Sequence, residues 1–163
     1  ATFVDMDAPN HMHQRNMVAA FFTPEFTDSL RPSIQSTVDK FLNGMIEKGC
    51  DKPVDLVESF SLPIPSTVIY DILGVPITDM DYLTNTNAVR SNGSSTAAAA
   101  QGANEELLRY LDNLVDKRIA DPKNDLISTL IKEQLNLGHL DKFDVVQLAF
   151  LLLVAGNATL VNM

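Results

Sequence analysis

The sequence predicts an all-α fold, because apolar residues recur at helical spacing along most of the chain and helix-capping signals separate the segments. No stretch shows the alternation of apolar and polar residues that is typical of a half-buried strand. The clearest early segment places an apolar side chain every three or four residues, at Leu30, Ile34, Val38, Phe41, Leu42 and Met45.

Capping residues and prolines set the expected ends of the first helices. Thr23-Pro24-Glu25 has the order of a cap, a first-turn proline and a first-turn acid, and Gly49 is a plausible stop. Ser66 to Leu73 is expected to be a short apolar helix that ends before Gly74. Its entry segment, Ser61 to Pro65, is expected to be non-helical in its interior because it carries two prolines.

Four further helices are expected in the second half of the chain. In the helix expected from Glu105 to Ala120, Glu105 and Arg109 stand four residues apart and are expected to pair. The helix expected from Asp141 to Met163 is apolar on most sides and is therefore expected to lie at the centre of the fold. The four segments are Thr78 to Arg90, Glu105 to Ala120 ending at Asp121-Pro122, Asp125 to Gln134 before Gly138, and Asp141 to Met163.

Composition excludes several classes of protein. The 163 residues suit one domain, and 45% apolar residues supply a core. The net charge of −9 disfavours nucleic acid and an anionic membrane surface as partners. The apolar stretch from Val145 to Gly156 is shorter than the roughly 20 residues of a membrane anchor. The single Cys50 excludes an internal disulfide and favours a reducing, intracellular setting.

One segment lacks both acidic residues and a hydrophobic pattern. Ser91 to Gly102 reads SNGSSTAAAAQG, and from Tyr82 to Asn104 the only charged residue is Arg90. The segment is expected to be either a flexible surface connection or a mobile lid near the entrance for an anionic ligand.

The first candidate site lies near the amino end. Asp7 is expected to cap a helix with Pro9 in its first turn, which places His11 and Arg15 one turn apart on one face. Two donors stacked in this way can bind carboxylate groups.

Two other interpretations of the same residues stay open. Arg15 can pair with Asp5 or Asp7 as an ordinary surface residue. His11 and His13 can bind a metal only if the segment is a strand, because two residues apart they diverge on a helix.

The second candidate site lies in the last expected helix. Ala155, Gly156 and Ala158 remove bulk from a buried segment, and glycine in a helix costs about 1 kcal/mol relative to alanine. Either a flat ligand against the backbone or close helix packing explains the glycine equally well. Thr159 can bond back to the carbonyl of Ala155, and Asn157 adds a second polar group.

These two motifs, in this order, resemble the cytochrome P450 superfamily of haem-thiolate enzymes. DAPNHMHQR resembles the H-x-x-x-R stretch of the family's helix C, and AGNAT resembles the A-G-x-(D/E)-T of its helix I. TPEFTDSLRP resembles the start of helix D, and Asn87 to Asn104 falls at the F–G lid. The resemblance implies a partial cytochrome P450 fold, helices C to I, with residues 1–163 as the middle of one haem-binding domain truncated at both ends.

Within this superfamily the sequence most resembles the fungal nitric oxide reductase branch, in the strings FVDMD, HMHQR, NAVRSNGSST and AFLLLVAGNAT. This branch implies reduction of nitric oxide to nitrous oxide with electrons taken directly from NADH or NADPH, without a redoxin. Oxygen-activating members carry an acid where this chain has Ala158, so a proton-relay group is missing and the reductase is favoured. The alternatives are a monooxygenase fed by a redox-protein partner and a non-catalytic helical interaction domain.

The resemblance also implies roles for single residues around haem b (iron protoporphyrin IX). His11 and Arg15 would bind the haem propionates, and Ala155 and Gly156 would lie against the distal haem face. Thr159 and Asn157 are the implied catalytic residues and Arg90 an implied NAD(P)H contact. The family's thiolate loop, F-x-x-G-x-x-x-C, is not in this sequence, and the segment EKGCDKP around the single cysteine does not match it, so no metal ligand is expected in this chain.

Partners and location follow from the same resemblance. We expect nitric oxide and NAD(P)H as partners, and no nucleic acid, membrane anchor or redoxin. The expected location is intracellular and soluble, either cytoplasmic or mitochondrial.

Overall fold

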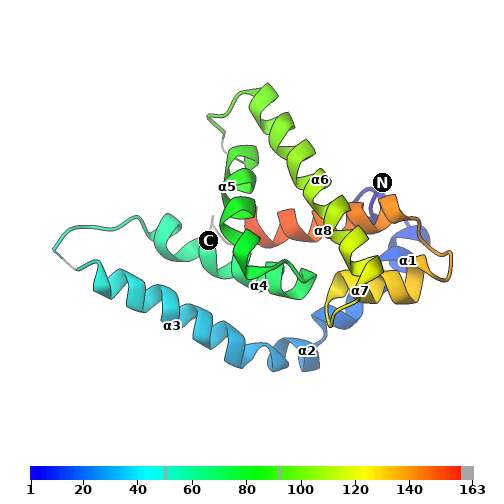
Figure 1. Cartoon of the computed structure of the whole chain (residues 1–163), viewed down its shortest axis with the longest axis horizontal. Coiled ribbons are helices and arrows are strands. Elements are labelled where there is room, and N and C mark those ends of the chain that lie inside the picture. The colour runs from blue at the N-terminus through cyan, green and yellow to red at the C-terminus, as the bar shows by residue number, and fades with distance from the viewer. Residues whose placement is uncertain (50, 92, 159–163) are drawn as a thin grey trace.

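The computed structural model describes residues 1–49, 51–91 and 93–158, and every regular element among them is a helix. The all-α prediction is therefore confirmed. Helix α8, Lys142–Ala158, runs through the middle of the molecule, and helices α4, Pro63–Leu73, and α6, Ala97–Ala120, pack against it (Figure 1). In the described part of the chain, no helix is both long and apolar enough to cross a membrane.

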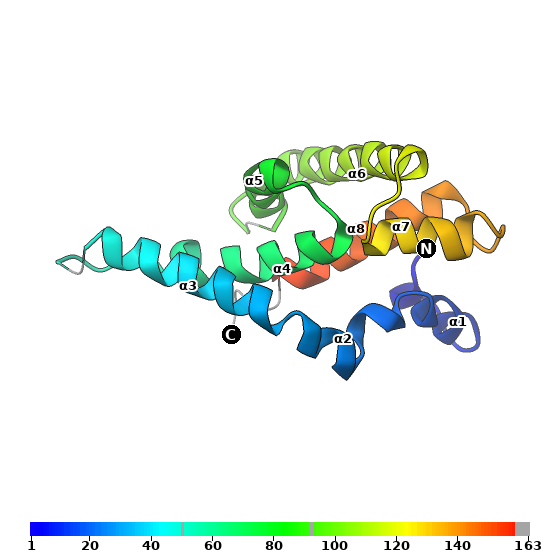
Figure 2. The ribbon, with the colours of Figure 1, turned by 60° about the horizontal axis from the view of Figure 1, so that its bottom comes forward.

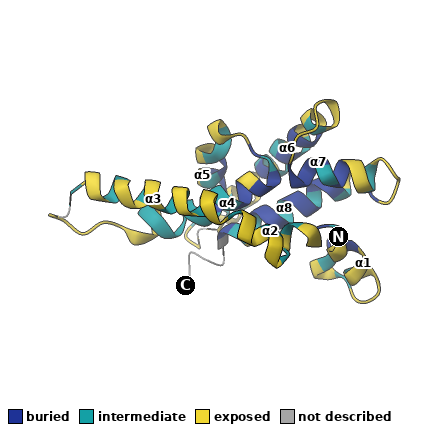
Figure 3. Ribbon diagram, turned by 90° about the horizontal axis from the view of Figure 1, so that it is seen from below, coloured by how far each residue is buried: buried dark blue, intermediate teal, exposed yellow. Residues whose placement is uncertain are grey.

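The core lies where these three helices meet α7, Leu126–Leu130. Figure 3 shows the buried residues gathered on α4, α6, α7 and α8, whereas α1 and α3 are mostly half-buried or exposed. Each fully buried leucine contributes roughly 1.5–3 kcal/mol relative to an exposed one. The fully buried leucines include Leu73, Leu107, Leu111, Leu126, Leu148 and Leu153.

The helices of the amino-terminal third follow the sequence signals closely. Thr23 caps α2, Pro24–Ser29, with its Oγ1 accepting a hydrogen bond from the Phe26 amide at 3.2 Å. Helix α3, Arg31–Glu47, carries the periodic apolar stripe, and Gly49 follows it with a φ of +89°. The expected cap and stop are therefore both confirmed, although a break at Leu30 separates the capped helix from the long one.

Asp7 does not cap the first helix, which corrects the sequence-based expectation. Helix α1, Asn10–Asn16, has Pro9 at its N-cap position and no side-chain cap. Asp7 instead accepts through its backbone carbonyl, from the His11 amide at 3.0 Å. The carboxylate of Asp7 is therefore not used in capping.

The entry to α4 is helical, so the expectation of a non-helical Ser61 to Pro65 was wrong. A π-helical turn covers Val57–Ser61, and α4 begins at Pro63. Both prolines occupy the first turn of α4, where backbone N–H groups have no partner inside the helix. Proline is therefore tolerated at both positions without the loss of a helical hydrogen bond.

The segment Ser91 to Gly102 is mostly helical, which corrects the expected flexible connection. Helix α5, Met80–Ser91, extends to its start, and Thr96 caps α6 by accepting from the Ala99 amide at 3.1 Å. Alanine has the highest helix propensity, so the alanine run after this cap forms the first turns of α6. The connection between α5 and α6 is therefore short.

Glu105 pairs with a residue other than the expected Arg109. Its carboxylate accepts a hydrogen bond from Gln101 Nε2 at 3.0 Å. Its neighbour Glu106 accepts from the Tyr82 hydroxyl of α5 at 2.5 Å. Glu105 is therefore paired within α6, whereas Glu106 is paired with a residue of α5.

A buried ion pair fixes the end of α6 to the start of α7. Arg118 Nε lies 2.6 Å from Asp125 Oδ2, and the same guanidinium donates to the carbonyl of Gly74. Asp125 also caps α7 through the Ser128 amide at 2.7 Å. The helix expected from Asp125 is therefore confirmed, and it continues as a π-helical turn over Ile131–Leu135.

Candidate functional site

Helix α1 presents the two basic side chains on one face, as the four-residue spacing predicts. His11 is half-buried and its ring lies against Phe3, with 6.0 Å between ring centroids and an angle of 52° between the planes. Arg15 is exposed one turn later, and the buried Val18 anchors the segment that follows. The local fold therefore holds a ring donor and a guanidinium side by side.

Arg15 makes no ion pair or side-chain hydrogen bond with any described residue. The alternative in which Arg15 pairs with Asp5 or Asp7 is therefore not the arrangement in the structure. Among residues 1–49, 51–91 and 93–158, no group of three histidine, cysteine or acidic residues is placed to hold a metal ion. An unpaired guanidinium on a fixed helix is suited to an anionic group supplied from elsewhere.

The free guanidinium borders a hollow that also reaches α8. Figure 2 shows α1 and α2 on one side of α8, with α5 and α6 on the other. The hollow has a volume of about 410 Å³ and joins Arg15 to Leu152, which is one helical turn before Gly156. Its remaining walls are Phe3, Val18, Ala19 and Phe22. The hollow therefore joins Arg15 of the first motif to α8 one turn before the second motif, with one cationic side chain and mostly apolar walls, and none of His11, Ala155 and Gly156 lines it.

A second hollow, of about 330 Å³, shares Phe22 with the first and is lined by Gly156. Its other walls come from α3 and α4 and are apolar: Ile34, Ile64, Pro65, Val68, Ile69 and Ile72. The two hollows therefore border α8 at Leu152 and at Gly156, and Arg15 lines only the first of them.

The absence of a side chain at Gly156 is explained by close helix packing. A Cβ atom added there would lie 2.8 Å from both Cβ and Cγ1 of Ile69 on α4. This supports the packing explanation that the sequence left open beside the flat-ligand one. Ala155, by contrast, is exposed on α8, so a flat ligand against that residue stays a prediction.

Asn157 is buried in the same turn, with 1% of its surface exposed. Its Nδ2 donates to the hydroxyl of Tyr70 on α4 at 3.2 Å, whereas its Oδ1 has no partner among the described residues. Burial raises the pKa of Tyr70, so its hydroxyl is neutral. Sequence reasoning missed Tyr70, whose hydroxyl is not distinctive in a helix that also carries Ser66, Thr67 and Asp71.

Of the other two predicted site residues, only Arg90 is among the described residues. Thr159 lies outside the described residues, so its predicted contacts stay predictions. Arg90, in the last turn of α5, donates from Nε to Asn87 Oδ1 at 2.9 Å, and burial lowers its pKa. Arg90 lines neither hollow on α8.

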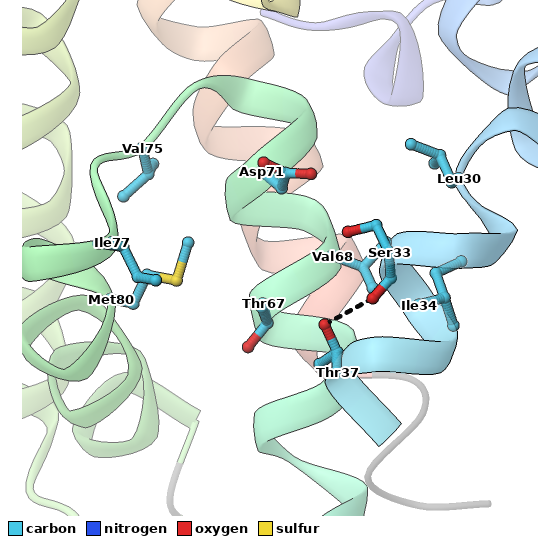
Figure 4. A pocket seen from close by; sticks show the side chains of 10 residues that line it. All are labelled: Leu30, Ser33, Ile34, Thr37, Thr67, Val68, Asp71, Val75, Ile77 and Met80. Atoms are coloured by element: carbon cyan, nitrogen blue, oxygen red, sulfur yellow. Dashed lines mark hydrogen bonds between the residues drawn. The ribbon is translucent and has the colours of Figure 1, made fainter. Parts of the chain in front are cut away.

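A further hollow, of about 250 Å³, lies between α3 and α4 and is not part of this site (Figure 4). Its polar side includes Thr37, whose Oγ1 donates to the Ser33 carbonyl at 2.9 Å. None of the predicted site residues lines it.

The chain is similar to several known proteins in sequence and in structure. The chain is 60% identical over 162 residues to cytochrome P450 55A3 of Fusarium lichenicola, covering 99% of this chain and 40% of that protein. It is 41% identical over 158 residues to pentalenic acid synthase of Streptomyces avermitilis, covering 97% and 39%. The crystal structure of GfsF superposes with a TM-score of 0.92 at 33% identity, covering 99% of this chain and 40% of that one.

The chain is homologous to the cytochromes P450. It spans about 40% of the length of the curated relatives it matches. No family model matches it. The resemblance in its sequence motifs is thereby confirmed, as is the partial all-α cytochrome P450 fold.

The residues of this segment fit the edge of a haem. The porphyrin is a flat apolar body with two carboxylates, and the cysteine thiolate of this family sets its electronics. The unpaired Arg15, with His11 beside it, suits the carboxylates, and the hollow between α1 and α8 supplies apolar walls. Ala155 is exposed on α8.

Proposed function

We propose that the complete protein carrying this chain is a haem-thiolate oxidoreductase that reduces nitric oxide to nitrous oxide. Two nitric oxide molecules, one NADH or NADPH and one proton would give nitrous oxide, water and the oxidised nucleotide. The observation that carries the proposal is the 60% identity to a fungal cytochrome P450, and the strings that resemble the nitric oxide reductase branch support it.

The first role of this chain in the proposal is to hold the cofactor. Arg15 binds one haem propionate through its two-pronged guanidinium, and His11 binds a propionate from one turn earlier. When bound, the haem supplies an iron centre for nitric oxide. Residues 1–163 thus form part of one haem-binding domain.

The second role is to leave the ligand side of the haem open and to handle the proton. The methyl group of Ala155 limits bulk on the exposed face of α8. Thr159 and Asn157 hold a proton donor, such as a water molecule, near bound nitric oxide. Ala158 lacks the carboxylate that serves oxygen activation in other members, which suits a reaction in which hydride comes from a nicotinamide.

Arg90 is proposed to attract the pyrophosphate of NADH or NADPH. It is the only charged residue between Tyr82 and Asn104, in a chain of net charge −9, so the acid-free window does not repel an anion. The proposal includes direct electron transfer from the nucleotide, with no redoxin. It also includes a location inside the cell, in the cytoplasm or mitochondria, where both nucleotides are found.

The test is nucleotide oxidation by the complete haem-loaded protein. We expect nitric oxide to drive NADH or NADPH oxidation without any redoxin, with one nitrous oxide formed per nucleotide oxidised. Strict dependence on a redoxin, with hydroxylation of an organic substrate by oxygen, would instead support a monooxygenase. That alternative has support from bacterial relatives such as the vitamin D3 dihydroxylase of Streptomyces griseolus, at 34% identity.

A further inference from the structure

The hollow between α3 and α4 has a polar edge made of two pairs of residues, and the members of each pair stand one helical turn apart. Ser33 and Thr37 belong to α3, and Thr67 and Asp71 belong to α4 (Figure 4). Residues four apart share one face of a helix. Each helix therefore turns a short polar stripe toward the same space, which has a volume of about 250 Å³.

The polar atoms of this edge are mainly hydrogen-bond acceptors. Thr37 Oγ1 donates its proton to the Ser33 carbonyl at 2.9 Å, and Thr67 Oγ1 donates its proton to the Pro63 carbonyl at 2.8 Å. A hydroxyl has one donor and two lone pairs, so both threonine hydroxyls have only acceptor capacity left. The carboxylate of Asp71 also accepts only. A ligand at this edge must therefore supply the donors.

The carboxylate of Asp71 has no counter-ion in the described part of the chain. It forms no ion pair and no side-chain hydrogen bond with a described residue, and no described basic side chain lines the hollow. Asp71 is exposed, so its charge can be reached from solution. A primary ammonium group carries a positive charge and three N–H donors but no acceptor, which matches this edge.

The other walls of the hollow favour an organic cation over a metal ion. They are apolar side chains: Leu30, Ile34, Val68, Val75, Ile77 and Met80. A hydrocarbon chain gains free energy by leaving water for such walls, whereas a hydrated metal ion does not. The volume lies below the roughly 300–1,000 Å³ of sites for drug-sized ligands, so a short chain suits it.

We propose that this hollow binds a small primary alkylammonium ion. Its ammonium group donates to the polar edge at Thr37, Thr67 and Asp71, and its alkyl chain packs on the apolar walls. This site goes beyond the proposed reduction of nitric oxide. None of the proposed haem contacts lines it, although Ile34 and Val68 also border the hollow at Gly156.

The test is a titration of the complete protein with hexylammonium, followed by NMR of ¹³C-labelled methionine methyl groups. Met80 lines the hollow, so its methyl resonance reports binding there, and Met80→Leu identifies that resonance. Amines also bind haem iron directly, so any haem is kept ferrous with carbon monoxide on the iron. We expect a saturable shift at roughly millimolar ligand, because water screens the exposed carboxylate. The absence of a saturable shift would overturn the proposal.

Two further ligands separate the parts of the recognition. Hexyltrimethylammonium keeps the charge and the chain but has no N–H donor, and hexanol keeps the chain but has no charge. We expect each to bind about tenfold more weakly than hexylammonium, since charge-assisted hydrogen bonds are the strong ones. Equal affinity for hexanol would make the hollow a purely apolar surface, and equal affinity for the trimethyl compound would exclude the donor match. Either result would overturn the proposal.

Variants of the polar edge complete the test. Asp71→Asn should weaken hexylammonium binding about tenfold, and Thr37→Val with Thr67→Val should weaken it less. Glu47→Gln is the control, because Glu47 is exposed on the same helix, roughly three turns beyond Thr37, and does not line the hollow. It should leave the affinity unchanged.

Unchanged affinity in Asp71→Asn, or an equal loss in Glu47→Gln, would show that general charge and not this site attracts the amine, and would overturn the proposal. If Asp71→Asn does not fold, the paired valine variant decides by the same criterion. Failure of nitric oxide to drive nucleotide oxidation would refute only the proposed function, because the Met80 shift does not depend on that reaction.

Discussion

The guanidinium of Arg15 borders a hollow with apolar walls and has no ion-pair partner among the described residues. Its replacement in the complete protein therefore tests its proposed bond to a haem propionate. We expect Arg15→Ala to weaken haem binding by about 1.5–3 kcal/mol, the contribution of a charged hydrogen bond. The haem affinity of Arg15→Lys should lie between those of the wild-type protein and Arg15→Ala, because lysine keeps the charge but loses the paired geometry.

The measurement is the rate of haem transfer to an excess of apomyoglobin. Arg31→Ala is the control, because Arg31 is exposed on α3 and pairs only with the exposed Asp28. Equal haem loss from the Arg15 and Arg31 variants would show that Arg15 does not hold the cofactor.

Gly156 tests a second contact at the residue scale. Alanine there would gain about 1 kcal/mol of helix propensity, but overpacking a tight contact costs about 1–3 kcal/mol. Because the new Cβ would lie 2.8 Å from Ile69, we expect net destabilisation in Gly156→Ala. Urea denaturation should show that Gly156→Ala lowers the free energy of unfolding by less in an Ile69→Ala background, where two of the three closest atoms are removed. Equal costs in both backgrounds would refute the packing explanation.

The sequence could place His11 and Arg15 on one face, because their spacing alone decides it. It could not decide why residue 156 is glycine, since the answer lies in Ile69, 87 positions earlier. Tyr70 was missed for the same reason: its partners are on two other helices. Local spacing predicts which side chains share a face, but not what packs against that face.

At the scale of elements, the start of α6 depends on one hydroxyl. Thr96 accepts from the Ala99 amide, and loss of such a cap costs about 1 kcal/mol. We expect Thr96→Ala to destabilise the protein by that amount and Thr96→Ser to be nearly neutral. Hydrogen exchange of the first-turn amides of α6 should rise only in the alanine variant. Equal exchange in the alanine and serine variants would contradict the capping role.

The junction of α6 and α7 depends on a buried ion pair. Asp125 is 4% exposed, so Arg118→Met would leave its carboxylate buried without a counter-ion. Breaking such a pair from one side costs about 3–5 kcal/mol, and denaturation of this variant should show that loss. Lys123→Met is the control, since its pair with Asp121 is exposed and worth at most about 1 kcal/mol. Similar losses in both variants would refute the special role of the buried pair.

The element boundaries show where sequence signals suffice. The cap at Thr23 and the stops at Gly49 and Gly74 were predicted because the side chain or the positive φ acts locally. The start of α4 was mispredicted because prolines were treated as helix breakers, although the first turn accepts them. The alanine run before Gly102 has no apolar pattern, so its helix was missed despite a high propensity.

At the scale of the whole molecule, α8 organises both the core and the candidate site. It packs on α4 and α6, and its residues Leu152 and Gly156 border the two hollows that share Phe22. The sequence predicted this central place from the apolar character of the helix on most sides. It could not predict that Arg15 and Leu152 border one hollow, because chain folding over more than a hundred residues brings them together.

The most direct test of the central claim is an experimental structure of the complete protein with haem bound. The account predicts that the guanidinium of Arg15 lies within hydrogen-bonding distance of a haem propionate while Ala155 of α8 faces the porphyrin. A haem held elsewhere, with α1 and α8 packed together and no porphyrin between them, would contradict it.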